Sequence, residues 1–451
     1  MSSRSLRTHL AALPIQSLVA LAAPLVRFAA PPGGRKRIFT AENVFWMFLA
    51  QVLGPARTCR DVLRSAQAWL CATLSDSTSA YCQGRGRLPQ EALDKTFLAL
   101  ARRLRERPGG LWMNRPVLVV DGTSLSMPDT PKNQALYPQP KRQKPGCGFP
   151  VMRLVALFSL ATGAVLGVAK GSLVDPERLL WHQLWKLLRK GSVVLADRGF
   201  CSFAEYCVLL RKGVDSVMRL HARRSVGVRK IARLGKSDWL VEWQKTGRCP
   251  KWMTQRQWRR LPTVLRVRHI EVSVEIAGFR TQALTIATTI LDADAYPAEC
   301  FADLYRRRWM VELFLRDIKI TMGMDILRCK TPALVHKELV MHLIAYNLVR
   351  ALMLQAAERH GSELARISLA GALAAIRNWA PVLAVERSRT KRAQRLDDLY
   401  NCMARDIVPW RPDRCEPRAK KRRPKVYQLL NKPRSEFKEI QHRNRYSKAL
   451  S

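Results

Sequence analysis

The spacing of hydrophobic residues changes several times along the chain, and the first part has helical spacing. Between Ile38 and Leu104 the apolar positions predict three helices, separated at Gly54-Pro55 and at Pro89. The first two are joined by a short glycine-containing turn, as in a helix-turn-helix, although most helical hairpins bind no DNA. We therefore expect a helical region over residues 1–110 as the candidate DNA-binding part.

After residue 110 the helical pattern gives way to short apolar runs. Val117–Val120 and Val193–Ala196 have the length and composition of buried strands. The uncharged run Leu154–Ala169 is shorter than the roughly 18 residues of a membrane span and has Thr162-Gly163 at its centre, which predicts a hairpin. Helical patterns accompany these strands. The order strand, hairpin, helix, strand, helix predicts a mixed α/β layer over residues 111–222.

A β-rich insertion interrupts this layer. From residue 223 to 290 apolar and polar residues alternate over several stretches, which predicts an all-β segment. Helix resumes over residues 291–330, which we expect to return to the α/β core. Residues 331–451 are predicted to form further helices and then, from Arg387 onward, a basic segment broken by prolines. Such a segment is typical of a flexible arm that binds phosphates.

The charge of the chain narrows its possible partners. The 451 residues include 78 Lys and Arg against 35 Asp and Glu, a formal net charge of +43. At 47% hydrophobic residues the chain can still bury a sizeable core, so it is no disordered basic tail. A folded protein with this much self-repulsion is best explained by a polyanionic partner. Nucleic acid is the first candidate and an acidic membrane surface the second, and an ordinary metabolic enzyme is excluded.

Cysteine usage and the amino terminus bear on location. The 11 cysteines contain no C-x-x-C pair, which favours reduced thiols over a zinc ribbon or a disulfide framework. Leu10–Val26 imitates a signal peptide, but Pro14, Gln16 and Pro24 interrupt it. We therefore expect a cytoplasmic protein associated with the nucleoid.

Two acidic residues stand where an α/β sheet places its active sites. Asp121 and Asp197 each directly follow one of the four-residue apolar runs, so both are expected at the carboxyl ends of buried strands. The alternative is structural, since aspartate at a strand end also forms Asx turns and helix caps. The eight histidines show no metal-ligand spacing, which leaves carboxylates as the candidate catalytic groups.

A third acidic residue lies on the helix that follows the insertion. If residues 305–319 form one α-helix at about 100° per residue, a single stripe about 60° wide contains Tyr305, Arg308, Glu312 and Lys319. Asp317 lies about 140° from Glu312 on that helix and is the weaker candidate. The alternative is a solvated helix face with an Arg308–Glu312 ion pair, which contributes only about a few tenths of a kcal/mol.

These residues carry a specific resemblance. The spacing Y-(2)-R-(3)-E-(6)-K at residues 305–319 follows a strand ending Asp121-Gly122-Thr123 and another reading Ala196-Asp197-Arg198-Gly199-Phe200. The chain thereby resembles the DDE transposases of the bacterial insertion-sequence-four family, the cut-and-paste group marked by the YREK signature. The likeness extends from about Ile38 to Lys432 and includes Tyr346–Arg350 in a late helix.

The resemblance implies a fold and a reaction. It implies a ribonuclease H-like core in which Asp121, Asp197 and Glu312 are the catalytic residues and hold two divalent metal ions, normally Mg²⁺ with Mn²⁺ as a substitute. It implies that Tyr305, Arg308 and Lys319 bind the DNA phosphate beside the scissile bond. The expected substrates are double-stranded DNA, as terminal inverted repeats and as target, and the expected assembly is a synaptic dimer. Cleavage would proceed through a hairpin and be followed by strand transfer.

Relatives that form hairpins stack an aromatic residue from the insertion on a flipped base. The candidates here are Trp239, Trp243, Trp252 and Trp258, each of which also suits a core position.

Three other interpretations fit parts of the pattern. A ribonuclease H-like nuclease such as a resolvase would share the carboxylates but has no evident need of the YREK stripe. A transposase-derived DNA-binding protein without chemistry is disfavoured by the intact acidic residues. Membrane attachment through residues 10–26 is the most distant alternative.

Overall fold

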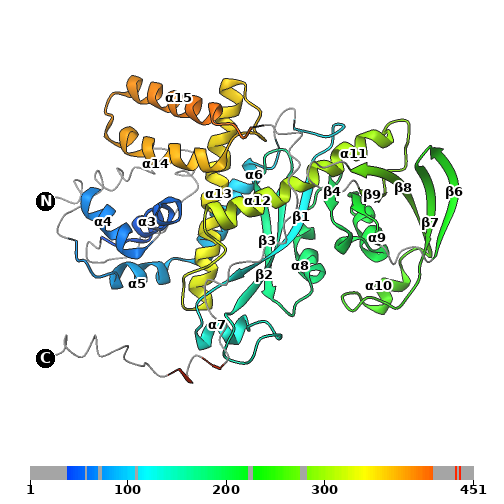
Figure 1. The fold of residues 1–451 in the computed structure, drawn as a ribbon, viewed down its shortest axis with the longest axis horizontal. Coiled ribbons are helices and arrows are strands. Elements are labelled where there is room, and N and C mark those ends of the chain that lie inside the picture. The colour runs from blue at the N-terminus through cyan, green and yellow to red at the C-terminus, as the bar shows by residue number, and fades with distance from the viewer. Residues whose placement is uncertain are drawn as a thin grey trace.

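A single mixed sheet runs through the centre of the molecule (Figure 1). The computed structural model describes residues 38–55, 58–69, 74–106, 110–221, 227–274, 282–409, 432–433 and 436–437. The strands are β1 Val117–Ser126, β2 Val151–Ser159, β3 Val165–Ser172, β4 Val193–Ala196, β5 Asp215–Arg219, β6 Val228–Gly235, β7 Asp238–Gln244, β8 Val264–Val274 and β9 Gln282–Thr288. They form a nine-stranded sheet in the order β3-β2-β1-β4-β5-β9-β8-β7-β6.

The first five strands form the predicted α/β layer. β1, β4 and β5 are parallel to one another, and β2 and β3 form the predicted antiparallel hairpin beside β1. Gly163 lies in its turn with φ of +69°, a left-handed conformation that favours glycine. The prediction that the first strand ends at Asp121 is wrong, because antiparallel pairing with β2 continues to Ser126. Only the parallel pairing with β4 stops earlier, at Val119 opposite Leu195.

The predicted insertion is β-rich and extends the same sheet. β9 pairs antiparallel with β5, with Val217 opposite Thr288, so β6 to β9 continue the core sheet instead of forming a second one. The segment is not all-β, since it also contains helix α10 Gln255–Arg259. Thr254 and Gln257 form a capping box at its amino terminus, which explains a short helix in a strand-rich segment.

Helices cover both faces of the sheet (Figure 1). On one face α8 Glu177–Leu184, the 3-10 turn Trp185–Leu187 and α9 Phe203–Arg211 pack on alternate residues such as Leu118 and Val120. On the other face α11 Ala298–Arg306, α12 Met310–Arg316 and α13 Pro332–His360 share a core with Val117 and Val119. Burial on both faces explains why β1 and β4 contain unbroken apolar runs.

Four helices form the amino-terminal part that the structure describes: α3 Ala41–Leu53, α4 Cys59–Trp69, α5 Ser79–Arg87 and α6 Gln90–Arg103. Thr58 accepts a hydrogen bond from the Asp61 amide (3.1 Å), as expected for the start of α4. α5 escaped prediction because its sequence has two glycines and no apolar stripe. It packs closely on α3, where a Cβ on Gly84 would lie 2.7 Å from the Val44 side chain.

The carboxyl-terminal part is helical further than predicted. After the short α7 Pro131–Leu136 and the long α13 come α14 Leu369–Val385 and α15 Arg389–Arg405, so the prediction of a flexible segment from Arg387 is wrong as far as Arg405. Ser388 caps α15, and Leu399 and Met403 are buried along it. Residues 410–431 of the predicted basic segment and the signal-like segment at residues 10–26 lie outside the described residues.

α13 is long and apolar enough to cross a membrane by length and composition alone. Of its most apolar window, 89% is buried inside the protein, as in the central helix of a folded core.

The buried ion pair of Arg268 joins β7 and β8 and should be the costliest one to break. The Arg268 side chain is 1% exposed, binds the Asp238 carboxylate and donates to the carbonyls of Asp292 and Tyr296. Arg268→Ala leaves Asp238 buried without a cation and should lower the free energy of unfolding by about 3–5 kcal/mol. Arg266→Ala on the same strand removes a 67% exposed partner of Glu242 and should lower it by less than about 1 kcal/mol. Urea denaturation of the two variants tests this difference, and equal losses would contradict it.

Candidate active site

The register between β1 and β4 brings the two aspartates to one place. Val119 pairs with Leu195; Asp121 lies two residues further along β1, and Asp197 lies two residues after Leu195, in extended backbone directly past the end of β4. Because side chains alternate between the faces of a sheet, both carboxylates lie on the same face as Val119 and Leu195. That face is the one covered by α11, α12 and α13. The expectation that both aspartates stand at the carboxyl ends of buried strands holds for Asp197, which directly follows β4, but is wrong for Asp121, because β1 continues to Ser126.

The helical segment above this face is not one continuous α-helix, as the stripe calculation assumed. α11 is followed by a 3-10 turn at Arg307–Trp309, then α12, then a π-helical turn at Asp317–Thr321. A 3-10 turn rotates successive side chains by more than an α-helix does, and a π turn by less. The two deviations therefore change the rotation of successive side chains in opposite directions.

The stripe residues contact one another and the strand below. Arg308 Nη2 lies 3.3 Å from Glu312 Oε1, and its guanidinium lies 4.9 Å from the Trp309 ring centre and 5.8 Å from that of Tyr305. Lys319 Nζ donates to Thr123 Oγ1 (2.9 Å). Thr123 is two residues beyond Asp121 on the same face of β1, so the Lys319 ammonium lies over the face of the sheet that carries Asp121.

The pKa of Asp121 shows that the three carboxylates are close enough to interact. Burial raises this pKa to about 6, while the Gly122 amide (2.8 Å) and Arg308 lower it. The negative charges of Glu312 and Asp197 raise it further. Asp317 does not belong to this group. Burial raises its pKa to about 6 as well, but the charges that act on it are those of Arg316 and Arg350.

The structural alternative for Asp197 does not account for its side chain. Asp197 precedes the 3-10 turn Arg198–Phe200, yet its carboxylate makes no capping hydrogen bond to that turn. Tyr305 lies near it: burial raises the pKa of the Tyr305 phenol to about 12, Arg308 lowers it, and the charge of Asp197 raises it. The Asp197 carboxylate is thus close enough to the Tyr305 phenol to affect its pKa.

The donor set suits a hard divalent cation. Carboxylate oxygens are the ligands that Mg²⁺ and similar ions prefer, and a cation would relieve the mutual repulsion recorded in the raised pKa of Asp121. Among the described residues no three Asp, Glu, His or Cys side chains are grouped tightly enough to hold one ion together. The Glu312 carboxylate is instead directed to Arg308 and is 45% exposed, which leaves it free to rotate.

Sequence reasoning missed Thr123 as the partner of Lys319. The signal was its position, since residues two apart on a strand share a face. Of the four candidate tryptophans, Trp243 is fully buried and donates to His269 Nε2 (2.9 Å), so it is a core residue. Trp239, Trp252 and Trp258 are partly exposed at the edge of the same core.

Comparison with known proteins identifies the class. The chain belongs to the family described as transposase DDE domain, whose match covers residues 112–348 and so includes Asp121, Asp197 and Glu312.

Within that class it is a DDE transposase of the IS4 family, an enzyme of DNA cleavage and strand transfer. It is 27% identical over 328 residues, 72% of each chain, to the transposase InsG for insertion sequence element IS4 of Escherichia coli (strain K12). It is also 39% identical over 61 residues, 14% of this chain and 16% of the other, to the putative transposase InsL for insertion sequence element IS186A of the same organism.

Among solved structures, the piggyBac transposase synaptic complex with hairpin DNA matches 92% of this chain and 87% of its own at 9% identity, with a TM-score of 0.44.

The raised pKa of Asp121 predicts that replacing its carboxylate with a neutral side chain stabilises the fold by an amount that depends on pH. Because the folded pKa of about 6 lies above the ordinary 3.8, ionised Asp121 destabilises the fold, and this loss develops as pH rises from 3.8 through 6. In EDTA, Asp121→Asn should raise the free energy of unfolding by up to about 3 kcal/mol at neutral pH and by far less near pH 4. Denaturation at both pH values measures this, and an equal gain at the two would refute it.

Proposed function

We propose that Asp121, Asp197 and Glu312 are the catalytic carboxylates of this transposase. The observation that carries the proposal is geometric: Asp121 and Asp197 each come two residues after the paired Val119 and Leu195 of β1 and β4, and Glu312 pairs with Arg308 on the helical segment that covers this face. Side chains that are 76 and 191 residues away in the sequence thus act on one point of the sheet, in a chain with only 35 acidic residues. Their chemistry fits the divalent ions that this family generally uses, and we assign Mg²⁺, with Mn²⁺ as a substitute.

Asp121, Asp197 and Glu312 would hold a pair of divalent ions, and the chemistry gained would be activation of the attacking oxygen and stabilisation of charge on the leaving one. The protein's own part is positioning. β1 and β4 hold Asp121 and Asp197 rigidly, whereas Glu312 must turn away from Arg308 to complete the set.

That rotation would also free Arg308 for substrate. The Arg308 side chain is 10% exposed, and its buried Nε has no hydrogen-bond partner among the described residues. Once Glu312 leaves, the scissile phosphate would be the replacement anion, and a guanidinium suits it because it donates two parallel hydrogen bonds. Lys319, held by Thr123, would bind the same phosphate from the other end of the stripe. Tyr305 is buried, so it would act through Arg308 and not by surface contact.

The substrates would be the terminal inverted repeats of the element and a target duplex. α3 is almost entirely buried, which leaves α4, with Arg60 and Arg64 exposed one turn apart, as the helix to contact DNA ends. We propose hairpin formation at the cut ends, with Trp239, Trp252 or Trp258 stacking on a flipped base. Cutting and joining two ends together would require a synaptic dimer, working on DNA in the bacterial nucleoid.

Neutralising any one of the three carboxylates should separate binding from cleavage. Asp121→Asn, Asp197→Asn and Glu312→Gln should bind DNA that carries the element's own ends and should not cut it in Mg²⁺. The matched control is Glu177→Gln, because Glu177 contacts Gly122 from the opposite face of the sheet. This variant should cut normally. Gel assays for nicks and hairpins give the readout, and cutting by any of the three variants would show that the residue concerned is misassigned.

Removal of the phosphate-binding cations should slow strand transfer. Arg308→Ala and Lys319→Ala should each reduce the rate by about 10²–10³-fold, as for other groups that stabilise transition-state charge. Thr123→Val removes the acceptor that holds Lys319 and should give a smaller loss in the same direction. Rates measured on pre-cleaved ends isolate this step. Unchanged transfer by Arg308→Ala and Lys319→Ala would rule out their role at the phosphate.

A further inference from the structure

The turn between β2 and β3 is held by three side chains of the late helix α13. Tyr346 Oη donates to the Gly163 carbonyl (2.8 Å), and Arg350 Nε donates to the Thr162 carbonyl (2.8 Å). Asn347 Oδ1 accepts from the Val165 amide and its Nδ2 donates to the Val165 carbonyl, both at 2.9 Å. β3 is the edge strand of the sheet, so Asn347 occupies both backbone groups that a further strand would otherwise bind. We call these residues and Thr162–Val165 the turn clamp.

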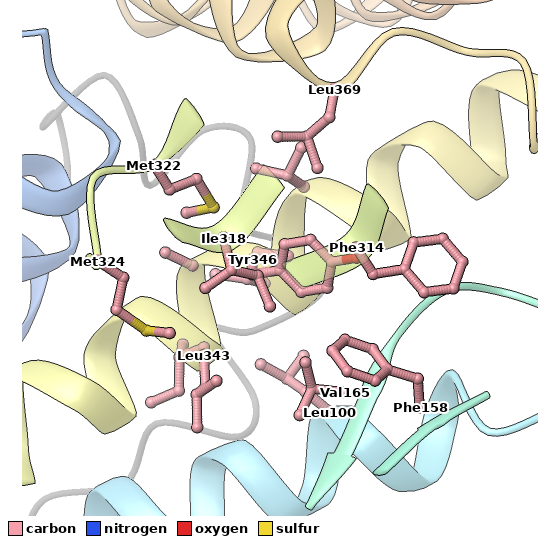
Figure 2. Close-up of a cluster of buried hydrophobic side chains, with 14 of the residues drawn as sticks. Leu100, Phe158, Val165, Phe314, Ile318, Met322, Met324, Leu343, Tyr346 and Leu369 are labelled. Carbon is pink, nitrogen blue, oxygen red and sulfur yellow. The ribbon is translucent and has the colours of Figure 1, made fainter. Parts of the chain in front are cut away.

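The turn clamp also contacts the segment that carries Glu312. Phe314, two residues after Glu312, lies with its ring centre 5.5 Å from that of Phe158 on β2 and 5.5 Å from the Arg350 guanidinium. A Cβ on Gly163 would be 2.8 Å from the Phe314 ring and 2.6 Å from Arg350. Figure 2 shows Phe158, Val165, Phe314 and Tyr346 in one buried cluster. The helix therefore rests directly on the turn.

Arg350 acts on this segment at a second position. Its charge lowers the pKa of Asp317, which burial raises, in the π-helical turn that follows α12. The buried guanidinium thus bridges the hairpin turn, Phe314 and the region of Asp317. Both ends of α12 are irregular, with a 3-10 turn before it and a π turn after it. Such a short helix has little intrinsic rigidity, so its position depends on what it packs against.

We propose that Asn347 and Arg350 are positioning residues for the reaction: by fixing the hairpin turn under Phe314, they set where Glu312 stands over the Asp121–Asp197 pair. Neither residue touches the candidate carboxylates. The proposal rests on the proposed role of Glu312 for its effect on cleavage, but the mechanical part, control of α12 by the turn, stands independently of that role.

The first measurement tests the mechanical part without using activity. In Asn347→Ala and Arg350→Met, hydrogen exchange of the amides in Met310–Arg316 should accelerate along with those of the turn. Gly163→Ala approaches the contact from the other side, with a strained φ and a Cβ directed at Phe314, and should have the same effect. The matched control is Leu399→Ala, which removes a fully buried side chain of α15 far along the chain from the turn. It should leave exchange in α12 unchanged. Acceleration confined to the turn would overturn the proposal.

The second measurement tests the consequence for the reaction in the full-length protein. The two α13 variants should bind end DNA within about twofold of the parent affinity but cleave it about a hundredfold more slowly. The Mn²⁺ concentration for half-maximal cleavage should rise about tenfold, as when a group supporting a metal ligand is lost. Arg350→Lys, which keeps a donor for Thr162, should recover part of the rate. Cleavage losses no larger than those of Leu399→Ala, or an unchanged Mn²⁺ midpoint, would overturn the positioning role. If Glu312→Gln cut DNA normally, the proposed catalytic role of Glu312 would be wrong. The hydrogen-exchange measurements would still test whether the turn clamp controls the position of α12.

Discussion

The parallel pairing of β1 with β4 is the constraint on which the rest of the site depends. It brings two carboxylates from separate parts of the chain to the same height and the same face of a sheet that is buried on both sides. Only a rigid element can hold like charges together, because flexible side chains would move apart. In this setting the pKa of Asp121 is raised, mainly by burial and to a smaller extent by the charges of Glu312 and Asp197.

The positively charged side chains of the site balance only part of this negative charge. Arg308 pairs with Glu312, the carboxylate that lies on a helix and is substantially exposed, while Asp121 and Asp197 have no ion-pair partner among the described residues. The exposed carboxylate of Glu312 thus keeps the buried Arg308 guanidinium paired. Exchange of both partners, metal for Glu312 and phosphate for Arg308, would convert an internal ion pair into two contacts with the reacting groups. The proposed assembly therefore requires no new charge to be buried without compensation.

The parts of this fold that the sequence predicted are those set by local pattern. Val117–Val120 and Val193–Ala196 could be recognised because strands buried on both faces contain unbroken apolar runs. The α5 and α15 helices could not be recognised, because the packing of Gly84 against Val44 and of α15 on α13 joins segments that are distant in the sequence. The length of β1 beyond Asp121 depends on β2, which lies about 30 residues later, and so has no local signal. The stripe from Tyr305 to Lys319 was recognised from its spacing, but the 3-10 and π turns within it arise from packing.

The irregular turns within the segment from Tyr305 to Lys319 affect how Glu312 is positioned. A straight α-helix would fix Glu312 through its own backbone hydrogen bonds, whereas a two-turn helix between a 3-10 and a π turn takes its position from the surfaces it touches. Those surfaces are the hairpin turn, through Phe158 and Gly163, and β1, through the Lys319–Thr123 contact. One end of the segment is thus attached to the strand that carries Asp121, and its middle rests on the neighbouring hairpin. β2 pairs with β1 along the stretch that contains Asp121, and it leads directly into the turn. A shift of the turn would therefore change the position of Glu312 relative to Asp121. In this way the same sheet would position all three carboxylates.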